Sequence, residues 1–80
     1  MRLDKYLKVS RIIKRRTVAN EACDNGRVLV NGRIARASYD VKPNDIIEIN
    51  LGMNTVKYQV VSISENATKQ SAGLMYKVME

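Results

Sequence analysis

Hydrophobic residues in the first ten positions recur at the spacing of a helix. Three of them share one side of such a helix: Leu3, Tyr6 and Leu7. At about 100° per residue, Asp4, Lys5 and Lys8 fall on the opposite side. The pattern therefore predicts a short amphipathic helix over Leu3–Val9, with a basic outer face.

A basic connection and a second helix are expected next. Residues 10–16 carry four bases, and Ile12 and Ile13 are their expected contacts with the core. Thr17 resembles a helix N-cap, because its hydroxyl can accept a hydrogen bond from a free backbone N–H of the following turn. Small or apolar residues then recur at helical spacing: Val18, Ala19, Ala22 and Cys23. This narrow stripe would let the second helix lie close to its neighbour, and Gly26 is placed to end it in the left-handed conformation.

After the second helix the pattern changes to the period of two that is typical of strands. Val28 and Val30 alternate before Asn31-Gly32, the strongest short hairpin signal in the chain. The expected return strand is 34–37, and 42–45 is a turn with Pro at a favoured position. Three further strands are expected, at 46–51, 55–63 and 74–79. A tight turn at 52–54 and a polar, mobile loop at 64–73 would connect them.

These elements predict the fold class α+β, with two or three short N-terminal helices packed on a small antiparallel sheet of four to five strands. Eighty residues allow one domain, which spans 1–80. A domain of this size has room for one binding face but little room for a deep catalytic cleft.

Positive charge is concentrated in the first half of the chain. Residues 2–36 hold ten of the fourteen Lys and Arg residues and only three acids, whereas residues 37–80 hold four bases and five acids. The ten bases are Arg2, Lys5, Lys8, Arg11, Lys14, Arg15, Arg16, Arg27, Arg33 and Arg36. Such an imbalance indicates a surface that binds a polyanion. Seven of the fourteen bases are Arg, whose planar guanidinium suits phosphate recognition better than the Lys ammonium does.

Folded RNA, read by its shape and backbone, is the polyanion that the composition favours. Four Tyr without Phe or Trp make a poor stacking platform for single strands. No helix carries Asn, Gln and Arg at the spacing that reads bases in duplex DNA. A DNA-binding module and a protein adaptor remain alternatives. Three methionines could offer the adaptor an apolar surface, although Met more often fills a core: Met53, Met75 and Met79.

Residues suited to catalysis or metal binding are scarce. The chain has no His, and its single Cys23 lies on the apolar stripe of the second helix, where a packing role is expected. We therefore expect no enzyme, no cofactor and no metal site. No apolar run approaches the ~20 residues of a membrane span, and charges interrupt the N-terminal region where a signal peptide would be apolar. The expectation is a complete, cytoplasmic, monomeric protein with no membrane partner.

Five short motifs stand out within the first fifty residues. They are Arg2-Leu-Asp-Lys-Tyr-Leu7, Ser10-Arg11, Arg15-Arg16-Thr17, Gly26-Arg-Val-Leu-Val-Asn-Gly32 and Val41-Lys-Pro-Asn-Asp45. Together they resemble the S-four RNA-binding domain, a family named after a small-subunit ribosomal protein. The resemblance implies its αL motif, a pair of helices packed on a small sheet, over about residues 1–50. Similarity to short, stand-alone members of the family continues through nearly the whole chain.

The resemblance implies a function on the ribosome. Stand-alone members of this kind act in ribosome-associated quality control, where they bind the free large ribosomal subunit that carries peptidyl-tRNA. They contact rRNA and tRNA and support C-terminal alanine tailing of stalled nascent chains. The expected partners are therefore large-subunit rRNA, peptidyl-tRNA and a tail-elongating protein. A heat-shock member of the family that handles freed large subunits is the alternative.

The resemblance also implies which residues contact RNA. Arg2 and Arg16 match important RNA-contacting arginines of the family. Asp4 is expected to pair with a nearby Arg, Arg16 in particular, and to orient its guanidinium. The full expected RNA-binding set is Arg2, Lys5, Lys8, Arg11, Lys14, Arg15, Arg16 and Arg33.

Overall fold

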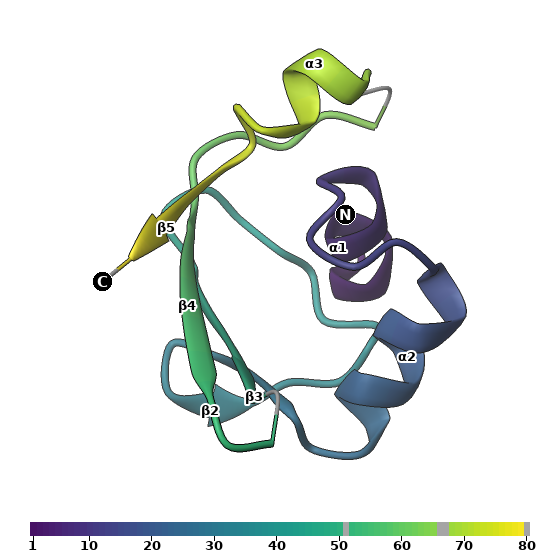
Figure 1. Cartoon of the computed structure of the whole chain (residues 1–80), viewed down its shortest axis with the longest axis vertical. Coiled ribbons are helices and arrows are strands. Elements are labelled where there is room, and N and C mark those ends of the chain that lie inside the picture. The colour runs from purple at the N-terminus through teal and green to yellow at the C-terminus, as the bar shows by residue number, and fades with distance from the viewer. Residues whose placement is uncertain (51, 66–67, 80) are drawn as a thin grey trace.

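A computed structural model describes residues 1–50, 52–65 and 68–79. Within these residues the helices are α1 (Leu3–Val9), α2 (Arg16–Asp24) and α3 (Lys69–Ala72). The strands are β1 (Val28–Val30), β2 (Arg33–Ile34), β3 (Ile46–Asn50), β4 (Thr55–Val60) and β5 (Tyr76–Met79). Helices α1 and α2 lie side by side against one face of a curved sheet, and α3 lies near the start of β5 (Figure 1). The predicted α+β class is confirmed, but the third helix belongs to the C-terminal half.

The sheet is antiparallel, in the order β2-β1-β3-β4-β5. Its register aligns one residue from each of four strands in a single row: Val30, Ile47, Tyr58 and Val78. Directly opposed residues of neighbouring strands share a face, so this row points to one side of the sheet. Because Val30 and Ile47 are buried, the row marks the face that the helices cover.

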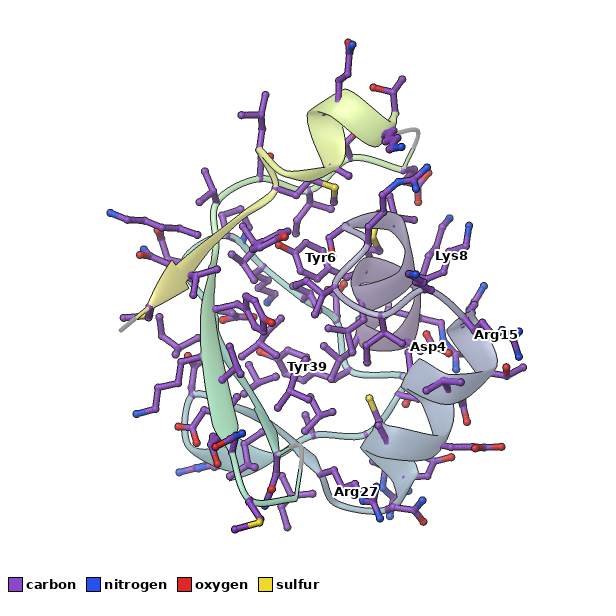
Figure 2. The ribbon with its side chains drawn as sticks, viewed as in Figure 1. Asp4, Tyr6, Lys8, Arg15, Arg27 and Tyr39 are labelled. Atoms are coloured by element: carbon purple, nitrogen blue, oxygen red, sulfur yellow. The ribbon has the colours of Figure 1, made fainter. Side chains whose placement is uncertain are left out.

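Helix α1 has the predicted bounds and supplies the centre of the core. Leu3, Tyr6 and Leu7 have no exposed surface, as their helical spacing predicts. Tyr6 points from α1 toward the sheet (Figure 2). Its hydroxyl donates a hydrogen bond of 2.6 Å to the backbone carbonyl of Met75, just before β5. The buried polar tip is thus satisfied, and the first helix is tied to the last strand.

Helix α2 begins two residues earlier than a Thr17 cap would allow. Its N-cap is Arg15, which has an extended backbone and no capping side-chain hydrogen bond, and Thr17 lies within the first turn. The prediction of Thr17 as N-cap is therefore wrong. The apolar stripe is also narrower than predicted, because only Ala19 and Cys23 are buried while Val18 is 47% exposed. Residues four apart face α1, and Val18 is rotated about 100° away from them.

The end of α2 follows the predicted turn chemistry. Gly26 adopts a φ of +73° directly after the helix. Its N–H donates to the carbonyl of Cys23, and the N–H of Arg27 donates to the carbonyl of Ala22. This pair of bonds is the Schellman motif, which satisfies two carbonyls that the helix end would otherwise leave free.

Two tight turns also match the sequence prediction. Asn31 and Gly32 both have positive φ, 54° and 83°, as a two-residue type I′ hairpin between β1 and β2 requires. Asn44 has a φ of 75° after Pro43, and the N–H of Asp45 donates to the carbonyl of Lys42. Residues 42–45 therefore form a type II turn.

The segment between β2 and β3 crosses the start of α1. The N–H of Leu3 donates to the Tyr39 carbonyl at 2.8 Å, and the N–H of Asp4 donates to the Ala37 carbonyl at 3.2 Å. These bonds satisfy the first free N–H groups of α1. They also explain why β2 stops at Ile34 and does not run over 34–37, since the chain leaves the sheet to reach the helix.

A buried carboxylate fixes the same segment to the hairpin. Asp45 is 8% exposed and accepts hydrogen bonds from the Tyr39 hydroxyl at 2.9 Å, the Asn31 amide at 3.1 Å and the Lys42 N–H at 2.9 Å. The side-chain oxygen of Asn31 in turn accepts from the N–H of Ile46. The hairpin turn and the start of β3 are therefore held together by side chains.

The C-terminal half differs most from the prediction. Strand β4 ends at Val60 and not at 63, because the N–H groups of Val61 and Ser62 both donate to the Met75 carbonyl and leave the ladder. The segment 64–73, predicted to be a loop, contains α3, where Thr68 and Ser71 form a reciprocal capping box. The predicted strand end at 51 lies outside the described residues.

Replacing Tyr6 with Phe removes one of three donors to the Met75 carbonyl, which keeps the N–H groups of Val61 and Ser62. We expect the free energy of unfolding to fall by ~0.5–1.5 kcal/mol, the net contribution of one hydrogen bond, measured by urea denaturation with an unchanged m-value. Tyr58→Phe is the control, because the Tyr58 hydroxyl has no hydrogen bond within the described part of the chain and its ring stays against Tyr76. Equal stability of Tyr6→Phe and Tyr58→Phe would contradict a role for the Tyr6 bond.

Candidate nucleic-acid interface

Asp4 lies at the contact between α1 and α2. Figure 2 shows it between the two helices, and only 2% of its surface is exposed. Its predicted place on the outer face of α1 is therefore wrong. By the helical period Asp4 lies about 100° from Leu3 and about 60° from Leu7, at the flank of the apolar side, and α2 packs against that flank and covers it.

Four groups donate hydrogen bonds to the Asp4 carboxylate. Oδ1 accepts from Nε of Arg2 at 3.2 Å and from the backbone N–H of Lys5 at 2.8 Å. Oδ2 accepts from Nη2 of Arg2 at 3.3 Å, from Nε of Arg16 at 3.4 Å and from the side-chain amide of Asn20 at 3.2 Å. One buried carboxylate thus holds two guanidiniums, which we call the arginine pair (Arg2 and Arg16).

The charge of Asp4 is maintained by these donors. Burial by itself raises the pKa of its carboxyl, but hydrogen bonds from Asn20, Arg2, the Lys5 amide and Arg16 together lower the pKa below its ordinary value. The carboxylate is therefore ionised at neutral pH and attracts both arginines.

The arginine pair is half exposed. The side chains of Arg2 and Arg16 are 51% and 49% exposed, so guanidinium edges that do not face Asp4 reach solvent. They line a pocket of about 420 Å³ together with Asp4, Thr17, Asn20 and Glu21. The arrangement presents two oriented guanidinium groups, and each can donate hydrogen bonds to the oxygens of a phosphate.

Three further predicted residues share a second site, which we call the basic groove. It has a volume of about 520 Å³ and is lined by Lys8, Val9, Arg11, Lys14 and Glu65. Lys5 lies beside it, with its Nζ 3.6 Å from Oε1 of Glu65. Its bases come from the end of α1 and from the connection to α2.

Arg15 and Arg33 complete the predicted set but lie in different places. Arg15 is exposed at the start of α2, and Figure 2 shows it with Lys8 on the side of the molecule away from the sheet. Arg33 lies in β2 and lines a separate pocket of about 630 Å³ with Arg36 and Tyr39. The structure thus does not bring Arg33 to the arginine pair or to the basic groove.

Three polar residues of these sites were missed by the sequence reasoning: Asn20, Arg36 and Glu65. Asn20 is the fourth donor to Asp4, and it lies four residues after Arg16 in α2. Residues at that spacing share a helix face, so the pairing of Asp4 with Arg16 already pointed to it. Arg36 and Glu65 had no such signal in the sequence. Arg36 lies in the pocket of Arg33 because of where β2 ends, and Glu65 reaches the basic groove from the segment after β4.

Cys23 has the expected packing role. It is 2% exposed, and burial, followed by the charges of Asp4 and Asp24, raises the pKa of its thiol to about 11. The thiol is therefore protonated at neutral pH and unsuited to nucleophilic attack. Of the three methionines, Met75 is in the core, whereas Met53 and Met79 are exposed.

Among 1–50, 52–65 and 68–79, no three His, Cys, Asp or Glu residues are grouped so that they could hold a metal ion. No helix in these ranges is long and apolar enough to span a membrane.

Comparison with known proteins identifies the family. The model of the S4 domain matches residues 1–47, which include the arginine pair and the three bases of the basic groove. The chain belongs to the S4 domain family. The resemblance to the S-four domain predicted from the sequence motifs is thereby confirmed.

Two relatives in the S4 family match almost the whole chain. One, from Streptococcus pneumoniae, is named "RQC P-site tRNA stabilizing factor"; it is 51% identical over 79 residues, which cover 99% of this chain and 90% of the relative. A protein of the same name from Bacillus subtilis is 48% identical over 80 residues, covering 100% and 93%. The trimeric structure of heat shock protein 15 from Vibrio cholerae superposes with a TM-score of 0.89 at 28% identity, covering 99% of this chain and 81% of that one.

Asp4 should make stability depend on acidity. Its folded-state pKa lies below the ordinary aspartate value of about 3.9, so its contribution is complete above that pH and is lost as the pH falls through the folded pKa. Asp4→Asn should lower the free energy of unfolding at pH 7 by ~1–3 kcal/mol and flatten its dependence on pH below about 4. Urea midpoints across the acid range measure both effects.

Asp24→Asn is the matched control, because Asp24 is an exposed carboxylate in α2. It should change the urea midpoint at pH 7 by much less. Identical pH profiles for the wild type and Asp4→Asn would contradict the role of the buried carboxylate.

Proposed function

We propose that this protein binds structured RNA in ribosome-associated quality control and stabilises tRNA in the P site of the large ribosomal subunit. Two relatives with that role in their name match the chain over nearly its full length at 51% and 48% identity. The observation that carries the proposal is the arginine pair, two half-exposed guanidiniums held by one buried carboxylate.

The arginine pair suits RNA backbone recognition for a physical reason. A free Arg side chain loses rotamer freedom when it binds, and that loss opposes association. Arg2 and Arg16 are already restrained by Asp4, so less freedom remains to be lost. Their exposed N–H groups can each donate to phosphate oxygens, in the charge-assisted geometry that makes such bonds short and strong.

The separation of the basic sites suits a factor that braces two RNA elements. The arginine pair and the basic groove share no lining residue. One can contact rRNA while the other contacts the tRNA, so both RNAs are held by one rigid body. Linking two weak contacts in this way raises the occupancy of each.

In this role the protein works in the cytoplasm and catalyses no reaction itself. By holding peptidyl-tRNA on the freed large subunit, it supports C-terminal alanine tailing of the stalled chain by a separate elongating protein. The S4 family to which the chain belongs is defined by an RNA-binding domain, and Cys23 is buried with a raised pKa.

A second candidate function is the handling of freed large subunits in the manner of a heat-shock S-four protein. The structural likeness to heat shock protein 15 favours it. The proteins recovered with tagged chain from cells distinguish the two. Large subunits with tRNA and an elongating partner support the tailing role, whereas large subunits with tRNA but no such partner support subunit handling.

Arg2→Ala and Arg16→Ala should each weaken binding to large subunits that carry peptidyl-tRNA by about tenfold. A hydrogen bond to a charged group contributes ~1.5–3 kcal/mol, and the lower end of that range corresponds to about a tenfold change in the dissociation constant. Co-sedimentation over a concentration series measures the effect, with circular dichroism to check the fold. Lys77→Ala is the control, because Lys77 is an exposed base on β5. Unchanged co-sedimentation of both Arg variants would remove the arginine pair from the interface.

The same variants separate RNA recognition from general attraction of charge. Labelled tRNA and duplex DNA of matched length are titrated over a salt series. RNA should bind more tightly, and Arg16→Ala should reduce the dependence of log K on log salt by roughly one contact. Equal affinity for tRNA and duplex DNA would reject RNA recognition in favour of nonspecific attraction to phosphates.

A further inference from the structure

The basic groove contains an acidic residue. Glu65 follows β4 in the chain, yet it lines the same groove as Lys8, Arg11 and Lys14. Its carboxylate lies 3.6 Å from Nζ of Lys5. The four bases in and beside the groove therefore already have an anionic group of the chain among them.

We propose that the basic groove binds an RNA phosphate at a site separate from the arginine pair. We also propose that the Glu65 carboxylate competes with this phosphate for the bases of the groove. This role of Glu65 rests on the proposed function, because it concerns the affinity of the protein for RNA. A carboxylate and a phosphate both present anionic oxygens to the same ammonium and guanidinium groups. RNA entering the groove must displace Glu65 from Lys5 or bind beside its charge.

The exposure of Glu65 allows it to be displaced. Its side chain is 68% exposed and that of Lys5 is 37% exposed, so water solvates both when they separate. An exposed ion pair of this kind is weak and is screened by salt. Phosphate can therefore replace the carboxylate. By contrast, Asp4 is buried among its donors and remains in place as a support.

The backbone of Arg11 supports the assignment of the groove. Arg11 follows the C-cap of α1 with a φ of +64°, the left-handed conformation in which Gly is the usual residue at helix ends, as Gly26 is after α2. Its N–H donates to the Lys8 carbonyl at 3.1 Å, which fixes the two bases relative to each other. The same turn that ends α1 therefore places the basic side chain of Arg11 beside that of Lys8, where both line the groove.

Glu65→Gln tests the competitor. Binding of labelled tRNA and of large subunits that carry peptidyl-tRNA is measured between about 50 and 200 mM salt. At low salt the variant should bind about two- to fivefold more tightly than the wild type, and the gain should shrink as salt rises. Glu48→Gln is the matched control, because it removes one negative charge from a pair with Lys57 in the sheet, 3.8 Å apart. Its affinity should stay near that of the wild type.

Equal gains for Glu65→Gln and Glu48→Gln would overturn the inference, since net charge alone would then explain both. Weaker binding of Glu65→Gln would also overturn it, because Glu65 would then assist RNA binding. Either result leaves the proposed function standing if the wild type binds RNA through the arginine pair. A wild-type protein that does not bind RNA would instead defeat both.

Arg11→Gly tests the groove independently. Removing the side chain while keeping the left-handed turn should leave the melting temperature unchanged or higher, yet reduce tRNA affinity about fivefold or more. A reduced melting temperature with unchanged affinity would mean that Arg11 serves the fold, and would overturn its place in the groove.

Discussion

The burial of the Asp4 carboxylate between α1 and α2 is the constraint on which the surface depends. A charge removed from water destabilises the fold unless it is paired and fully hydrogen-bonded. Here the partners are two arginines, one amide side chain and one backbone N–H, drawn from both helices. The packing of the helices and the orientation of Arg2 and Arg16 are therefore a single arrangement. A change that separates α1 from α2 would also release the arginine pair.

That arrangement needs a fixed first helix, and the rest of the chain provides it. The segment between β2 and β3 accepts the hydrogen bonds of the first α1 N–H groups, and Tyr6 is bonded to the carbonyl before β5. Asp45, Tyr39 and Asn31 hold this crossing segment to the hairpin. A small domain has few core residues, and here buried polar bonds supply the precision that a larger core would supply through packing.

The sequence predicts local features of this structure better than those that depend on contacts between elements. Hydrophobic periodicity or the backbone preference of a few residues is enough to predict four features. They are the bounds of α1, the Gly26 helix end, the Asn31-Gly32 hairpin and the 42–45 turn. The prediction of an exposed Asp4 is wrong because helical periodicity separates charged from apolar positions but does not show where α2 packs. Tertiary contacts likewise decide where α2 begins relative to Thr17 and whether Val18 is buried. They also decide where β2 and β4 end. In the site, the Asp4–Arg16 contact agrees with its prediction, and Asn20 follows from it by helical spacing. Arg36 and Glu65 instead enter through the folded arrangement of distant segments.

The bond between the Tyr6 hydroxyl and the Met75 carbonyl joins residues 69 positions apart. On a translating ribosome, α1 leaves the exit tunnel long before its partner has been made. Its apolar side has only partial cover until that late segment arrives, and contacts of long sequence separation form slowly because a large loop must close first. The helix that carries Asp4 is thus fixed against the sheet only after residue 75 has been synthesised. The arginine pair, which Asp4 orients, acquires its final geometry late in the synthesis of the domain.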